Sequence, residues 1–223
     1  MKKNLLIVLI LLNACTANGL LNDLTRENPI DTTPFFPADR AYVFVSSQTT
    51  AGDMSGLTAG GCSGGGPAQA DCACTAMARV ANLLRRRDSR FVAWLSTATD
   101  DASCRLLGVG GKACPITSGG EPWYLTDNVL IINGLAGITP TTGQLKKDEN
   151  NILTASSLTF TGTGGNGLAI GGDCNTWTSS SSLVTATGGS TGGNNASAWT
   201  QSNSGASALT CDTLQSVYCF ALP

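Results

Sequence analysis

The sequence ADCACTAMARVANLL, residues 70–84, has the clearest helical pattern in the chain. Its apolar side chains recur at the spacing that places them on one face of an α-helix: Cys74, Met77, Ala78, Ala81 and Leu84. Asp71 lies near the start and basic residues follow the end, so both charges suit the helix dipole. We therefore expect one main helix with a cysteine on its apolar face.

Short stretches rich in β-branched and aromatic residues lie on both sides of this helix, and we expect them to form strands. They are residues 42–45, 91–95, 158–161 and 217–220, while 129–132 is a strand or a buried turn. Residues 47–67 are rich in glycine and serine and are predicted to be loop. Residues 162–210 are dominated by Gly, Ser, Thr and Asn, and only their tryptophans and cysteines argue against disorder.

The first fifteen residues, MKKNLLIVLILLNAC, have the features of a bacterial lipoprotein signal. Two lysines precede an apolar run, residues 5–12, that is too short to span a membrane. The residues before Cys15 resemble a lipobox, so we expect Cys15 to carry the lipid; an ordinary secretory signal with a free Cys15 is the alternative. The predicted parts are a signal peptide (1–14), a lipidated N-terminus with a flexible tether (15–40) and one globular domain (41–223). We expect an outer-membrane protein exposed at the cell surface.

The cysteine content agrees with export. The chain has nine cysteines, and setting Cys15 aside leaves eight, an even number that can pair. Disulfides persist in oxidising compartments, which an exported protein enters. Charged residues make up only 13% of the chain, against about 25% in typical proteins. We expect crosslinks to carry much of the stability, so that reduction unfolds the protein.

The composition also excludes several classes of function. Without Lys2 and Lys3 the chain has 11 basic and 15 acidic residues, a formal charge of −4, which argues against a nucleic-acid partner. The chain contains no histidine, which is the usual general base and a common zinc ligand. Residues 61–65 and 188–192 match a nucleophile-elbow pattern only in their letters, because no histidine can act as partner. We therefore predict no enzymatic activity, no cofactor and no metal site.

The order of several landmarks resembles the leptospiral endostatin-like lipoproteins, whose domain is related to endostatin and to the C-type-lectin-like fold. The landmarks are AYVFVSS (41–47), ADCACTAMA (70–78), FVAWLS (91–96), FTGTGGNG (160–167), DCNTWTSSS (173–181) and YCF (218–220). The resemblance covers about residues 41–223. It implies an α+β domain in which one main helix packs on a small antiparallel sheet, the terminal strands lie together and a disulfide pins a long loop region.

The resemblance also implies part of the disulfide map. It pairs Cys74 with Cys219 and Cys174 with Cys211. The remaining four cysteines can pair in more than one way; the local choice is Cys62 with Cys72 and Cys104 with Cys114. Cys72 and Cys74 are not expected to bond to each other, because side chains two apart on a helix point in different directions.

Candidate binding residues fall into two groups. Arg85, Arg86, Arg87 and Arg90 form a dense basic patch that could bind sulfated glycans or an acidic host protein, or could be solvated cations at a helix C-terminus. Trp177 and Trp199 could anchor a partner or cap a minor core within the long loop region. Trp94 is expected in the core, and Trp123 in a loop without a role.

A calcium-dependent lectin is the main alternative to a protein-binding adhesin. Calcium needs several oxygen ligands, yet residues 199–210 contain no acid and the lectin Glu-Pro-Asn or Gln-Pro-Asp triplet is missing. Asp100, Asp101, Asp148 and Glu149 could hold a weakly bound ion, but we expect them to be solvated loop charges. By resemblance, we predict a non-enzymatic adhesin for laminin, fibronectin and complement factor H. A structural envelope lipoprotein without a host ligand is the other alternative.

Overall fold

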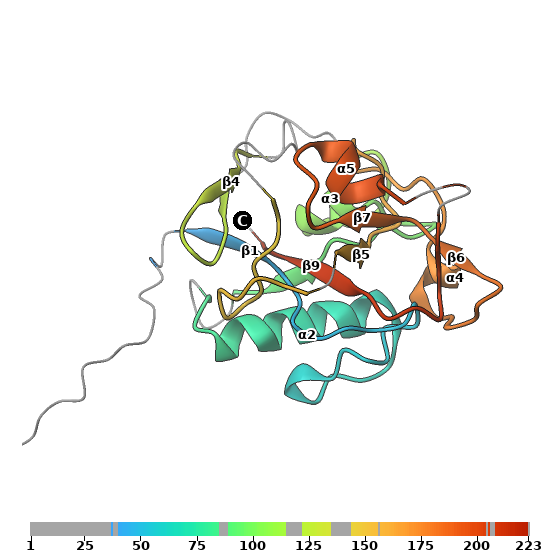
Figure 1. Ribbon diagram of the computed structural model, residues 1–223, viewed down its shortest axis with the longest axis horizontal. Coiled ribbons are helices and arrows are strands. Elements are labelled where there is room, and N and C mark those ends of the chain that lie inside the picture. The colour runs from blue at the N-terminus through green and yellow to red at the C-terminus, as the bar shows by residue number, and fades with distance from the viewer. Residues whose placement is uncertain are drawn as a thin grey trace, which may run out of the picture. The chain divides into compact units, whose positions relative to one another are not determined.

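The sheet is organised around the C-terminal strand β9 (Ser216–Ala221), whose six residues are all buried (Figure 1). The computed structural model describes residues 37, 40–84, 89–114, 122–134, 144–155, 157–203, 205 and 208–222. These residues all belong to a compact unit that spans Phe36–Pro223. The predicted signal peptide, Cys15 and nearly all of the predicted tether lie outside the described residues.

Strand β9 pairs with strands from three distant parts of the chain. On one edge it pairs antiparallel with β1 (Ala41–Val45), so that Phe44 lies opposite Cys219. On the other edge it pairs antiparallel with β2 (Phe91–Ala93) and parallel with β5 (Leu158–Phe160). The first and last strands of the domain are therefore neighbours, and both are buried.

The remaining strands extend this arrangement. The path through the larger, seven-stranded sheet is β4-β3-β1-β9-β5-β7, with β2 attached to β9 off this path. Its outer members are β3 (Trp123–Tyr124), β4 (Leu130–Ile132) and β7 (Gly188–Ser190), while β6 (Thr185–Ala186) and β8 (Leu209–Thr210) form a separate pair. The architecture is mixed α/β with a curled sheet, compatible with the predicted α+β class. The sheet is not wholly antiparallel, because β1–β3 and β5–β9 are parallel pairs.

The main helix, α2 (Gly66–Val80), begins and ends four residues earlier than residues 70–84 predict. Pro67 occupies the first turn, where its missing N–H leaves no hydrogen bond unmade. The helix ends before Asn82, which takes a left-handed φ of 58°. Cys74, Met77 and Ala78 are buried as predicted, whereas Ala81 and Leu84 lie beyond the helix. The helix packs against β2 and β9.

The other helical segments are short. They are η1 (Ala59–Gly61), α3 (Ala102–Leu106), α4 (Cys174–Trp177) and α5 (Ala196–Gln201). Within the described ranges, no helix combines the length and the apolar character that crossing a bilayer requires. The stretch 162–210 is thus not a plain loop, since it contains α4, α5 and strands of both sheets.

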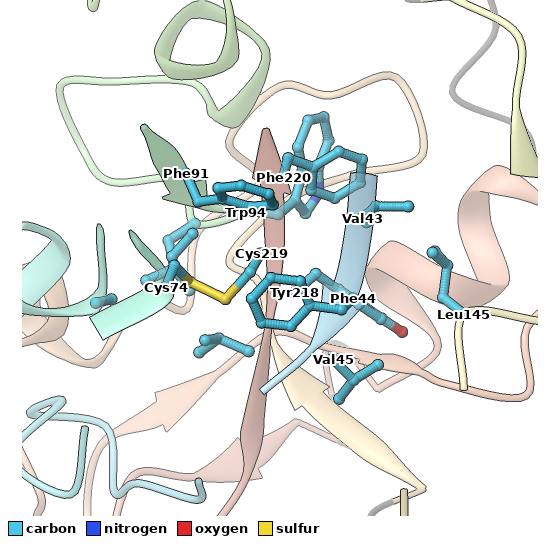
Figure 2. Packing of buried hydrophobic residues seen from close by; sticks show 14 of the residues in the cluster. Val43, Phe44, Val45, Cys74, Phe91, Trp94, Leu145, Tyr218, Cys219 and Phe220 are labelled. Atoms are coloured by element: carbon cyan, nitrogen blue, oxygen red, sulfur yellow. A yellow bond between two sulfur atoms is a disulfide. The ribbon is translucent and has the colours of Figure 1, made fainter. Parts of the chain in front are cut away.

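A cluster of aromatic side chains fills the core around β9 (Figure 2). The ring of Trp199 lies 5.3 Å from those of Trp94 and Tyr218, and 5.9 Å from that of Phe220. Trp123 was expected in a loop without a role, but it is buried in β3 and donates from its indole nitrogen to Ala221 O. Aromatic rings therefore contribute much of the core volume, beside the buried aliphatic side chains.

Four disulfides crosslink the described residues. They join Cys62 to Cys72, Cys74 to Cys219, Cys104 to Cys114 and Cys174 to Cys211, which are the four pairs expected. In Figure 2 the Cys74–Cys219 bridge connects α2 to β9 beside Phe91, Trp94 and Tyr218. Disulfide bonding is therefore a property of the fold, as the even cysteine count predicted.

Candidate ligand-binding groove

A groove of about 610 Å³ lies beside α2 and is lined by α2, β2, α3 and the loops around them. Its charged lining residues are Asp71, Arg79, Arg90 and Arg105. Three cations and one carboxylate in one hollow give it a positive charge, on a chain that is acidic as a whole.

The groove begins where side chains of α2 cap the free edge of β2. The Thr75 hydroxyl accepts from Phe91 N at 3.0 Å and donates to Phe91 O at 3.1 Å. Asp71 Oδ1 accepts from Ala93 N at 2.8 Å. Helix side chains thus replace the strand partner that β2 lacks on this edge.

Asp71 also forms an ion pair with Arg105 across the groove floor. Arg105 Nη2 lies 2.6 Å and 2.7 Å from the two carboxylate oxygens, and Arg105 Nη1 donates to Leu95 O at 3.2 Å. Burial raises the pKa of the Asp71 carboxyl above its ordinary value, against the opposing charge of Arg105. Arg105 therefore has mainly a structural role, because it links α3 to α2 and to the residues that follow β2.

Arg79 and Arg90 have the opposite character. Both are exposed, and no hydrogen bond or ion pair joins either side chain to another described residue. Asp71 forms its ion pair with Arg105 and also attracts Arg90 electrostatically. Among the described residues of the lining, Arg79 and Arg90 are therefore the exposed guanidinium groups that present positive charge to the groove.

One wall of the groove is a glycine-rich loop held to α2 by the Cys62–Cys72 disulfide. Gly60 makes this close approach possible, because a Cβ at Gly60 would lie 2.6 Å from the Cβ of Ala76. Gly60 also has a positive φ of 67°. The width of the groove thus depends on glycine at this position and on the disulfide.

The structure places only part of the predicted basic patch. Arg85, Arg86 and Arg87 lie outside the described residues, and Arg90 lies in the groove. Arg79 and Arg105 were not predicted. Arg79 could have been found from the polar spacing Asp71, Thr75, Arg79 along one helix face. Arg105 could not, because it reaches the groove only through the tertiary fold.

Trp177 and Trp199 are not surface anchors; of the two alternatives, burial in a core is the one that the structure confirms. Both are fully buried. The indole nitrogen of Trp177 donates to Ser96 O at 2.8 Å, and its ring packs against Phe160. Small polar residues surround both tryptophans in the sequence. A Cβ at Gly162 would lie 3.0 Å from the Trp177 ring, so glycine there allows the chain to approach it, while the Trp199 ring packs among the aromatic side chains of the core.

The expectation of solvated acidic loops is wrong for three of the four residues, because Asp101, Asp148 and Glu149 are buried. Asp101 accepts from Ala113 N and Ala169 N, Asp148 from Asn150 N and Ile152 N, and Glu149 from Ser47 N. Backbone N–H groups thus satisfy these carboxylates. In the described part of the chain, no three acidic or cysteine side chains are grouped so that they could hold a metal ion.

The Thr75 contacts lead to a stability prediction. Replacing Thr75 by valine keeps the shape but removes both hydrogen bonds to Phe91, which we expect to lower the free energy of unfolding by about 1–3 kcal/mol. Urea unfolding of Thr75→Val and of the control Thr58→Val measures the difference. Thr58 is exposed, so its replacement should change stability by less than about 0.5 kcal/mol. Equal effects of the two substitutions would contradict the capping role.

No family model matches the chain, and no curated protein matches it.

Proposed function

We propose that this protein is an exported, lipid-anchored and non-enzymatic binding module that holds anionic host ligands, above all sulfated glycans, in the groove beside α2. The single observation that carries the proposal is the pair of exposed guanidinium groups, Arg79 and Arg90, in a hollow of about 610 Å³. The absence of histidine from the sequence supports a binding role over a catalytic one.

The chemistry of the groove favours sulfate and carboxylate. A guanidinium group presents a planar fork of donors that matches the oxygens of both anions. Val92 and Leu222 add partly exposed apolar surface to the same lining, which suits the face of a sugar ring. A ligand with anionic groups on a less polar ring would use both kinds of surface.

The proposed fold family and the proposed anchoring at the outer membrane both come from the resemblance and the signal found in the sequence. The endostatin-like and C-type-lectin-like domain remains a proposal. It is supported by the tie from α2 to the last strand, by the pairing of β1 with β9 and by the bridge from Cys174 to Cys211. Anchoring through Cys15 at the outer membrane would hold the groove in reach of host molecules. Laminin, fibronectin and complement factor H are the partners proposed by resemblance.

Retention on immobilised heparin tests the groove. The double variant Arg79→Gln/Arg90→Gln should bind heparin about tenfold more weakly or worse, because each lost charged hydrogen bond contributes about 1.5–3 kcal/mol. Lys146→Gln is the control for charge outside the groove lining, and it matches each single variant, Arg79→Gln or Arg90→Gln, in removing one positive charge. The salt concentration of elution should fall for the double variant and stay near the original value for the control.

Other outcomes favour other functions. Equal retention of the double variant and the control would refute the groove as the site. Binding that disappears with a chelator would favour the calcium-dependent lectin. If heparin, laminin, fibronectin and factor H all fail to bind the oxidised protein, a structural envelope role would be the better explanation.

A further inference from the structure

We infer that the Cys62–Cys72 disulfide is a site of thiol–disulfide exchange, at which small anionic thiols form a mixed disulfide with Cys72. The inference rests on the positive charge that the proposed function also uses, but it needs no glycan. Three features of the groove carry it: the accessibility of the bridge, the freedom of its loop and the neighbouring arginines.

The Cys62–Cys72 bridge is the most accessible of the four. Cys72 is exposed on the outer face of α2, and both cysteines of the bridge line the groove. Cys74–Cys219 and Cys174–Cys211 are 0% exposed at both residues. In Cys104–Cys114, Cys104 is 0% exposed and Cys114 is only partly exposed. A dissolved thiol can therefore reach this bridge without unfolding the protein, and the buried bridges should not react.

The exposures also set the direction of attack. Cys62 is only 6% exposed, so the accessible sulfur is that of Cys72. The incoming thiol loses its proton to solvent, and its thiolate forms a new S–S bond with Cys72 Sγ. The bond between Cys62 and Cys72 breaks, and Cys62 leaves as a thiolate.

The loop that carries Cys62 can move away after this step. Gly61 and Gly64 flank it, and a Cβ at either position would meet no atom within 4 Å. This open space beside both glycines leaves room for the loop to shift, so that the Cys62 thiolate can separate from the mixed disulfide, which slows the reverse attack.

The arginines select the thiol. Arg79, Arg90 and Arg105 line the same groove as the bridge. Their positive charge attracts a thiol that bears carboxylates, and it stabilises the Cys62 thiolate as leaving group. A cationic thiol of the same structure gains no such attraction.

Glutathione and its diethyl ester test the inference, because they share one thiol and differ in their carboxylates. The full-length oxidised protein is first alkylated to block any free Cys15 thiol, then incubated with either compound and trapped with N-ethylmaleimide. Peptide mapping by mass spectrometry should find glutathione on Cys72 and the maleimide on Cys62. Glutathione should react about tenfold faster than the ester at low salt, after correction for thiolate concentration. Arg79→Gln/Arg90→Gln should lose most of this preference, and Lys146→Gln should keep it.

Three results would overturn the inference: no adduct, an adduct on another bridge, or equal rates for the two compounds. Heparin retention of the same samples separates it from the proposed function. If glutathione reacts faster than the ester but heparin does not bind, the exchange inference holds and the glycan proposal is refuted. If heparin binds but the two thiols react equally fast, the glycan proposal holds and the exchange inference is refuted.

Discussion

Replacing Cys74 and Cys219 together by alanine should lower the free energy of unfolding by about 5 kcal/mol, at least about a third of the stability of a typical domain. The bridge spans 145 residues, so its loss returns much conformational entropy to the unfolded chain. Both residues are fully buried, and their removal also opens space between α2 and β9.

The matched control is Cys104→Ala/Cys114→Ala. This bridge spans only 10 residues, and the same entropic reasoning gives about 3 kcal/mol. Thermal and urea unfolding of the two double variants, each free of new thiols, compares them directly. A loss in Cys74→Ala/Cys219→Ala no greater than in the control would show that the helix–strand tie is not the main crosslink.

The same substitution should also weaken the groove. Cys74 lies on the buried face of α2, while Asp71, Thr75 and Arg79 line the groove from the same helix. Without the bond to β9, the helix could move, which would weaken the hydrogen bonds from Asp71 and Thr75 to β2 and increase the distance between Arg79 and the other groove cations. We therefore expect reduced heparin retention even under conditions where the variant remains folded.

Gly189→Ala should destabilise the protein by at least about 3 kcal/mol, because it forces β7 and α5 apart. A Cβ at Gly189 would overlap the carbonyl oxygen of Trp199, which is backbone and cannot move alone. Displacing α5 withdraws the Trp199 ring from Trp94 and Tyr218, the aromatic contacts that fill the core. Loss of the near-ultraviolet circular dichroism signal should accompany the drop in melting temperature.

Gly192→Ala is the control for this prediction. A Cβ at Gly192 would meet its nearest atom at 3.6 Å, an ordinary contact. Its stability should therefore change by less than about 1 kcal/mol. Similar losses at both positions would indicate that glycine is needed for chain flexibility along this segment, and not for the close approach of α5.

Some features of this protein follow from local sequence alone. The runs of β-branched and aromatic residues at 42–45 and 217–220 predict β1 and β9, and the spacing of Cys74, Met77 and Ala78 predicts the buried face of α2. These signals are local, because a strand or helix repeats its pattern within a few residues. The even cysteine count predicted disulfide bonding for a similarly simple reason, since thiols in an oxidising compartment pair.

The tertiary structure alone decided which polar and aromatic residues are buried and where the groove lies. Trp199 and Asp101 look exposed in their polar surroundings, yet aromatic side chains of distant segments pack against the Trp199 ring and the distant backbone N–H of Ala169 donates to the Asp101 carboxylate. Asp71 meets Arg105, 34 residues away, only because α3 folds back toward α2. Burial and ion pairing depend on contacts between distant segments, and no periodicity within one segment encodes such contacts. The sequence therefore determined β1, β9, the buried face of α2 and the presence of disulfides, whereas tertiary packing determined the binding surface.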